Sequence, residues 1–211
     1  GASSGGIWKS SDGGNIWEDI GKNLESLTFG AIAIDPFNPE TIYAGSGEPR
    51  YLLSMNTYNG RGLYKSIDGG NTWDTITDGL GPYTHFSDII VSPQNPSILF
   101  ASLTSGSFNL GTNLSNEGVW KSSDAGESWY RVIDHPYACD LMFHPTDADT
   151  VYACIGGMSD SSGFYISSDL GENWTASNNG LNETTDISRM LVDISKSNTN
   201  CLRIRRSFII K

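Results

Sequence analysis

The chain of 211 residues is long enough to bury a hydrophobic core, and its formal net charge is −11. An acidic surface repels the phosphate backbone of nucleic acid, and no apolar stretch approaches the ~20 residues that membrane insertion needs. With 24 glycines, 18% charged residues and no sustained 3.6-residue periodicity, the composition favours an all-β protein over a helical one.

The first predicted element is a β-hairpin over residues 6–20, whose tip carries a motif that returns three times along the chain. The motif reads Ser-x-Asp-x-Gly-x-x-Trp and is here called the Asp-box. Its Ser and Asp can hydrogen-bond within a tight turn, its Gly permits a positive φ, and its Trp covers the turn. We therefore predict a structural role for the four copies, which are Ser10, Asp12, Gly14 and Trp17; Ser66, Asp68, Gly70 and Trp73; Ser122, Asp124, Gly126 and Trp129; and Ser167, Asp169, Gly171 and Trp174.

A second hairpin is predicted between successive boxes. Its first strand is a near-continuous apolar run, as in residues 30–34, which predicts burial on both faces. Together with the hairpin of the box, it gives each repeat four antiparallel strands, A to D. Units of this kind are typical of the blades of a β-propeller. Strand A is expected at the central axis and strand D at the outer edge.

The fold class predicted is therefore an all-β propeller of four-stranded antiparallel blades, in one domain, with about four blades' worth of chain. The segments expected are 6–20 (a C–D half), 28–78, 86–134, 137–180 and 187–205 (an A–B half). Two arrangements fit this count: a closed four-bladed ring, and a segment of a larger propeller, which we favour. In a segment, the open blade edges would allow two copies to pair as a homodimer.

Two of the three cysteines fall on one predicted hairpin. Cys139 and Cys154 would face each other across it, either as a disulfide or as two buried thiols, and we favour the thiols.

The sequence resembles the BNR/Asp-box repeat propellers over nearly its whole length, up to about Asn200. Residues 42–48 (Ile-Tyr-Ala-Gly-Ser-Gly-Glu) and 62–73 are most similar to sortilin-type propellers and to xyloglucan-degrading glycoside hydrolases. This resemblance implies that the boxes lie away from the ligand-binding face. It also implies a secreted or extracytoplasmic location.

Ligand-binding candidates follow from the rim opposite the boxes, where two B–C loops (46–61 and 102–117) are long. Aromatic rings beside hydrogen-bonding groups suit a protein or glycan ligand. Aligning the A strands also places Ala31, Asp88, Asp140 and Arg189 at equivalent positions near the channel mouth. They would hold a polar ligand or an ion, or form a solvated carboxylate pair. The candidates on the rim are Glu48, Arg50, Tyr51, Tyr58, Arg61, Tyr83, His85 and Tyr137.

No catalytic residue is assigned. The resemblance to xyloglucan-degrading enzymes implies a catalytic Asp just after a B strand, but residues 45–48, 102–104 and 155–157 contain none. The three histidines lack the spacing of metal ligands, and we predict no metal or cofactor. The function predicted is a non-catalytic module that binds protein or glycan through its B–C and D–A loops. The alternative is one propeller of a xyloglucanase-like glycoside hydrolase without its partner domain.

Overall fold

The computed structural model describes residues 5–48, 60–76, 78–81, 84–104, 116–157, 160–181 and 187–208. Within these ranges the regular elements are sixteen β-strands in five antiparallel sheets, which confirms the all-β class. No helix long and apolar enough to cross a membrane occurs in this part of the chain.

Three of the sheets have four strands and the two others have two. The first sheet pairs β1 (Trp8–Lys9) with β2 (Glu18–Asp19), and the last pairs β15 (Ile187–Ser195) with β16 (Asn198–Phe208). The complete blades are β3 (Phe29–Ile34), β4 (Ile42–Ser46), β5 (Leu63–Ser66) and β6 (Asp74–Ile76); β7 (Phe86–Val91), β8 (Leu99–Leu103), β9 (Gly118–Ser122) and β10 (Tyr130–Ile133); and β11 (Ala138–Phe143), β12 (Val151–Ile155), β13 (Gly163–Ser167) and β14 (Thr175–Ala176).

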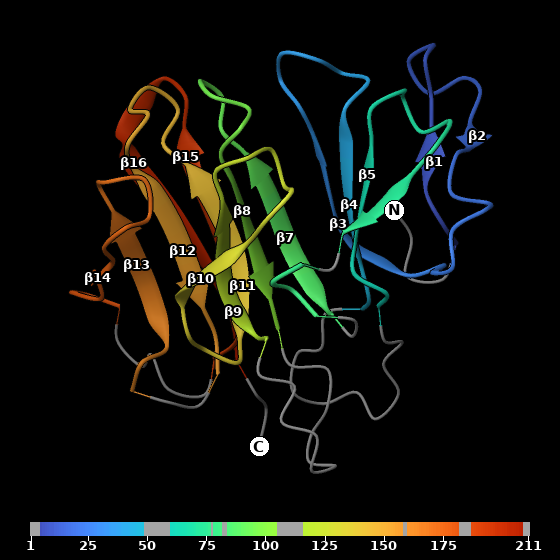
Figure 1. Ribbon diagram of the computed structural model, residues 1–211. Helices are drawn as coiled ribbons and strands as arrows, with labels where there is room; N and C mark the ends of the chain where they lie inside the picture. The colour runs from blue at the N-terminus through green and yellow to red at the C-terminus, as the bar shows by residue number, and fades with distance from the viewer. Residues whose placement is uncertain are drawn as a thin grey trace.

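The sheets stand side by side, from β1–β2 at one side to β15–β16 at the other (Figure 1). Their first strands, β3, β7, β11 and β15, pack against one another in that order, whereas β6, β10 and β14 lie at the outer edges. These are the positions predicted for strands A and D. Among the described residues, β16 pairs only with β15 and β1 only with β2, so the strands form an open arc and no closed ring is shown.

The prediction that strand A is the fully buried strand was wrong. The B strands β4, β8 and β12 are buried along their whole length, whereas β3 and β7 each have only two buried residues, and β3 ends on the exposed Ile34. The reason is position in the sheet. A B strand lies between two other strands and is covered by neighbouring blades on both faces, whereas an A strand borders the channel.

Each A strand has a register irregularity near its start. The shifts fall just before Ala31, Asp88, Asp140 and Arg189, so these four residues are structurally equivalent, as the sequence alignment predicted. Such bulges redirect a side chain relative to the regular pleat.

The hydrophobic core consists of four clusters, each between two successive sheets. Leu80 and Phe86, for example, pack with Trp129 between the first and second complete blades. The last cluster contains Cys139 and Cys154, which are free buried thiols, as we favoured. Burial raises the pKa of Cys139 to about 11. The fold therefore depends mainly on contacts between blades, as in other repeat proteins.

Candidate functional site

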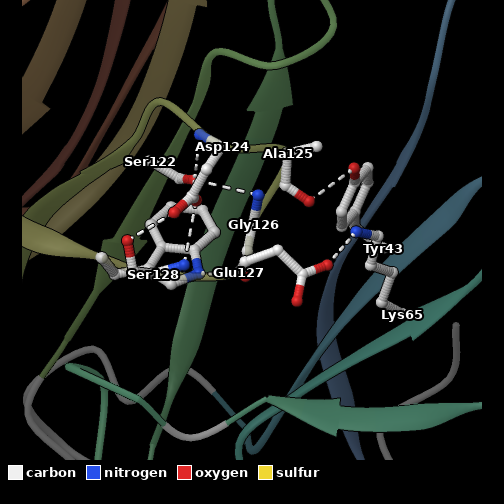
Figure 2. Close-up of polar contacts among 9 residues, drawn as sticks. Tyr43, Lys65, Ser122, Asp124, Ala125, Gly126, Glu127 and Ser128 are labelled. Atoms are coloured by element: carbon white, nitrogen blue, oxygen red, sulfur yellow. Dashed lines mark hydrogen bonds and ion pairs between the residues drawn. The ribbon is translucent and has the colours of Figure 1, made fainter.

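The Asp-box between β9 and β10 is held together by its own side chains (Figure 2). Ser122 Oγ donates to Asp124 Oδ1 (2.8 Å) and accepts the Gly126 N–H (2.9 Å). The Asp124 carboxylate also accepts the Ser128 N–H (2.9 Å) and the Ser128 hydroxyl (2.6 Å). The carboxylate is therefore saturated within the turn, which fits the structural role predicted for the box.

The other boxes repeat this arrangement, and it is reflected in the acidity of their aspartates. The side-chain hydrogen bond from Thr72 is the main cause that lowers the pKa of Asp68 to about 2, and that from Asn173 does the same for Asp169. In the first box, the backbone N–H of Ile16 contributes most to lowering the pKa of Asp12. These carboxylates stay ionised and occupied, so they are poorly suited to proton transfer.

The second, third and fourth boxes also contact the preceding blade, through residues that the sequence reasoning did not single out. Tyr43 donates its hydroxyl to Ala125 O (3.0 Å), and Lys65 Nζ lies 2.6 Å from Glu127 Oε1 (Figure 2). Burial, followed by the charges of Asp35 and Glu127, raises the pKa of Tyr43 to about 12, which keeps the hydroxyl a donor.

The lysine contact recurs along the chain. Lys9 donates to Gly69 O (3.0 Å), and Lys121 pairs with Glu172 (2.5 Å). A signal was present in the sequence, since a lysine directly precedes the first three boxes. Ile166 stands at the equivalent position before the fourth.

At the channel, Asp88 and Asp140 link one A strand to the next. Asp88 accepts the Ile89 N–H through Oδ1 (2.8 Å) and the Leu141 N–H of the next blade through Oδ2 (3.0 Å). Asp140 accepts the Val192 N–H in the same way (2.8 Å). The two candidate carboxylates thus act as acceptors between β7 and β11 and between β11 and β15.

The electrostatics show that the structure brings Asp88, Asp140 and Arg189 together. Burial, with the charge of Asp140 as a second cause, raises the pKa of Asp88 to about 7, against the backbone hydrogen bonds and the charge of Arg189. Burial also raises the pKa of Asp140, against the Val192 N–H and Arg189. No group of three potential metal ligands occurs among the residues described.

Four rim candidates, Arg50, Tyr51, Tyr58 and Tyr83, lie outside the described residues. Glu48 and Arg61 mark the two ends of the first long loop. Glu48 is half-buried, and Arg61 is exposed while its backbone N–H donates to Ser46 Oγ (2.7 Å).

The two remaining rim candidates are less accessible. His85 is only 4% exposed. Tyr137 is half-buried, with its ring edge-on to His135 (6.2 Å) and close to Gly157. Neither side chain is presented openly to solvent at the rim.

The base of the first long loop is fixed by Thr84, a residue that the sequence reasoning missed. Thr84 O accepts the Gly60 N–H (3.0 Å), and Thr84 Oγ1 accepts the Gly62 N–H (3.2 Å). Gly47 has φ +92°, and a Cβ there would lie 2.2 Å from Thr84 O, so only glycine fits. Residues 45–48, at the end of strand B, contain no carboxylate other than that of Glu48.

Comparisons with known proteins agree with this architecture. The Sortilin-Vps10 family model, described as sortilin, neurotensin receptor 3, matches residues 61–202. A xyloglucanase of Paenibacillus sp. is 27% identical over 190 residues, and a probable oligoxyloglucan-reducing end-specific xyloglucanase of Neosartorya fischeri is 29% identical over 160 residues. These alignments cover 76% and 68% of this chain, but the chain spans only 17% of the length of either relative.

Solved structures show the same fold. An ancestral GH74 enzyme superposes with a TM-score of 0.63 at 23% identity, covering 83% of this chain and 22% of its own. The GH74 xyloglucanase from Xanthomonas campestris superposes with a TM-score of 0.62 at 16% identity, covering 89% and 29%. The resemblance to Asp-box propellers of the sortilin and xyloglucanase type, predicted from the sequence, is thereby confirmed.

Proposed function

The chain belongs to the Sortilin-Vps10 family, and on this premise we propose that it is a non-catalytic propeller module that binds a xyloglucan-type glycan through its B–C and D–A rim. The ligand class comes from the xyloglucanases to which the chain is similar in sequence. The rim is where long connections leave the sheets, at the end opposite the boxes.

One observation carries the non-catalytic part of the proposal. Asp88 and Asp140, the two carboxylates near the channel, accept backbone N–H groups of neighbouring blades (3.0 and 2.8 Å). A carboxylate committed to holding two strands together is poorly placed to exchange a proton with a substrate, since its movement would break that contact.

A second candidate function is glycoside hydrolysis within a xyloglucanase-like protein. The pKa of Asp88, about 7, favours it, because a glycosidase needs one carboxyl group protonated beside another that is ionised. The two candidates predict different results with the same substrate.

The deciding experiment uses xyloglucan heptasaccharide and polymeric xyloglucan with the purified chain. Calorimetry should detect heptasaccharide binding, which Glu48→Gln and Arg61→Ala weaken by about tenfold. Asp149→Asn, an exposed residue at the box end of the sheets, is the control and should leave affinity unchanged. No reducing sugar should be released.

Two outcomes would overturn the proposal. Release of reducing sugar that Asp88→Asn abolishes would replace it with the hydrolase. Absence of heptasaccharide binding would reject the glycan ligand and leave a protein as the partner to be identified.

An extracytoplasmic location and pairing of two copies through open blade edges belong to the same proposal. Immunodetection of the protein in the source cells and their medium tests the first. The mass of the particle in solution tests the second, because a monomer at all concentrations contradicts it.

A further inference from the structure

A pocket of about 680 Å³ lies between the first sheet, β1–β2, and the Asp-box of the next blade. Glu18, Lys22 and Asn23 line it from the first sheet and the turn that follows, while Asn71, Thr72 and Trp73 line it from the box. The pocket combines box residues of one blade with residues 22–24 of the connection between β2 and β3, which is a D–A segment of the preceding sheet. Its lining contains neither Glu48 nor Arg61, so the two proposals are tested with different variants.

The orientation of Trp73 distinguishes this junction. In the other three boxes the Trp indole N–H donates to the box's own glycine carbonyl, at 3.0 Å each time. Trp73 Nε1 instead donates to Ile20 O of the preceding sheet (2.9 Å). The Trp73 side chain thus reaches across the junction and becomes part of the wall between the two sheets.

The next junction along the chain is filled at the equivalent place. There Leu80 is fully buried and packs with Trp129, and the Gly79 backbone is so close that a Cβ would lie 2.3 Å from Trp129 O. At the first junction the equivalent residues are Asn23, which is exposed, and Leu24, which is only half-buried. The Gly–Leu pair of one junction is therefore Asn–Leu at the other, where the leucine is less buried and the junction stays open.

The lining combines an apolar wall with unoccupied polar groups. Ile20, Leu24 and Trp73 supply the apolar side. Among the residues that the structure describes, Glu18, Lys22 and Asn23 make no side-chain hydrogen bond or ion pair and are exposed. The side chains of Asn71 and Thr72 already donate hydrogen bonds within the box. Asn71 Nδ2 donates to Asp68 O, and Thr72 Oγ1 donates to Asp68 Oδ2.

A ligand for this pocket must present an apolar face to an indole and polar groups at its edges. A sugar ring does both, because its axial C–H groups form an apolar face and its hydroxyls both donate and accept. Two carboxylates, Glu18 and Asp19, line the pocket against one ammonium, Lys22, which disfavours a polyanion. We propose that this pocket binds a neutral hexopyranose oligosaccharide, with a ring against Trp73 and hydroxyls at Glu18 and Asn23.

The test measures binding of two neutral probes, the tetrasaccharides of β-linked glucose and β-linked mannose, with trigalacturonate as the charged comparison. Titration is followed by NMR of the indole N–H signals, where the signal missing from Trp73→Phe identifies Trp73, and by calorimetry. At least one neutral probe should shift the Trp73 signal, and trigalacturonate should not.

The variants are chosen to leave the fold intact. Asn23→Tyr fills the pocket from an exposed position and should weaken binding more than tenfold, and Glu18→Gln should weaken it about threefold to tenfold. The matched control is Asp74→Asn, because Asp74 follows the Trp of the next box as Glu18 follows Trp17. Asp74→Asn and the rim variant Glu48→Gln should change nothing. The proposal is overturned if neither neutral probe shifts the Trp73 signal, or if Asn23→Tyr binds as the unaltered chain does.

Discussion

The glycine at the fifth position of the Asp-box is required by the backbone of the turn and, in some boxes, also by packing between blades. Variants of this glycine can distinguish the two requirements. Gly14, Gly126 and Gly171 all have positive φ, between +82° and +93°. They differ in what an added methyl group would meet. A Cβ at Gly14 would lie 3.7 Å from the nearest atom, at Gly126 it would lie 3.1 Å from Tyr43 Cε1, and at Gly171 it would lie 2.4 Å from Phe100 Cε1.

The expected losses of unfolding free energy follow this order. A positive φ costs any L-residue ~1–2 kcal/mol, and this contribution is common to all three Gly→Ala variants. At Gly171 the methyl group also overlaps Phe100, which is fully buried and packed edge-on against Phe143 (5.7 Å) and Trp174 (6.2 Å). A ring held in this way cannot move aside without cost, and overpacking adds ~1–3 kcal/mol. We expect Gly171→Ala to lose about 2–5 kcal/mol, Gly14→Ala about 1–2 kcal/mol, and Gly126→Ala a value between them.

Urea unfolding followed by circular dichroism measures these losses, provided that the dependence on urea concentration stays constant between variants. Phe100→Leu supplies the internal control. In the Gly171→Ala variant, Phe100→Leu should lower the free energy of unfolding less than it does in the unaltered chain, because it removes the overlapping ring atoms. Equal losses for the three Gly→Ala variants, with no such coupling, would show that the turn alone requires glycine and would refute the packing argument.

Three further predictions concern charged groups. Hydrogen bonds from side chains four residues further on hold the pKa of Asp68 and Asp169 near 2, so their stabilising contribution is complete above pH ~4 and is lost as the pH falls to about 2. Urea midpoints between pH 5 and 2 should fall steeply, and less steeply in Asp68→Asn. The pKa of Asp88 is raised, so its contribution is present below pH ~4 and is lost as the pH rises through about 7. A carboxyl ¹³C titration midpoint near 4 would contradict this. Lys121→Met and Glu172→Gln should be non-additive in a double-mutant cycle, and closer to additive in high salt, because solvent and ions screen this partly exposed pair.

The elements that the sequence determined by itself depend on neighbours along the chain. The Asp-box is one example, since Ser122, Asp124, Gly126 and Ser128 close a hydrogen-bonded turn within eight residues. The four-stranded repeat is another, because short apolar strands between such turns can pair only with their neighbours. These local rules were enough to predict the propeller class, the order of the strands and the equivalence of Ala31, Asp88, Asp140 and Arg189.

The tertiary structure alone decided what happens between blades. Asp88 accepts the N–H of Leu141, which lies 53 residues further along the chain. Trp73 stands at the same motif position as three other tryptophans, yet its indole N–H donates to Ile20 O of another sheet. Strand B is more completely buried than strand A for the same reason. In each case the partner comes from a different blade, and its position is set by how the sheets pack. The sequence pattern of one repeat therefore predicts its turn, but it does not predict which residues of the neighbouring blade pack against that turn.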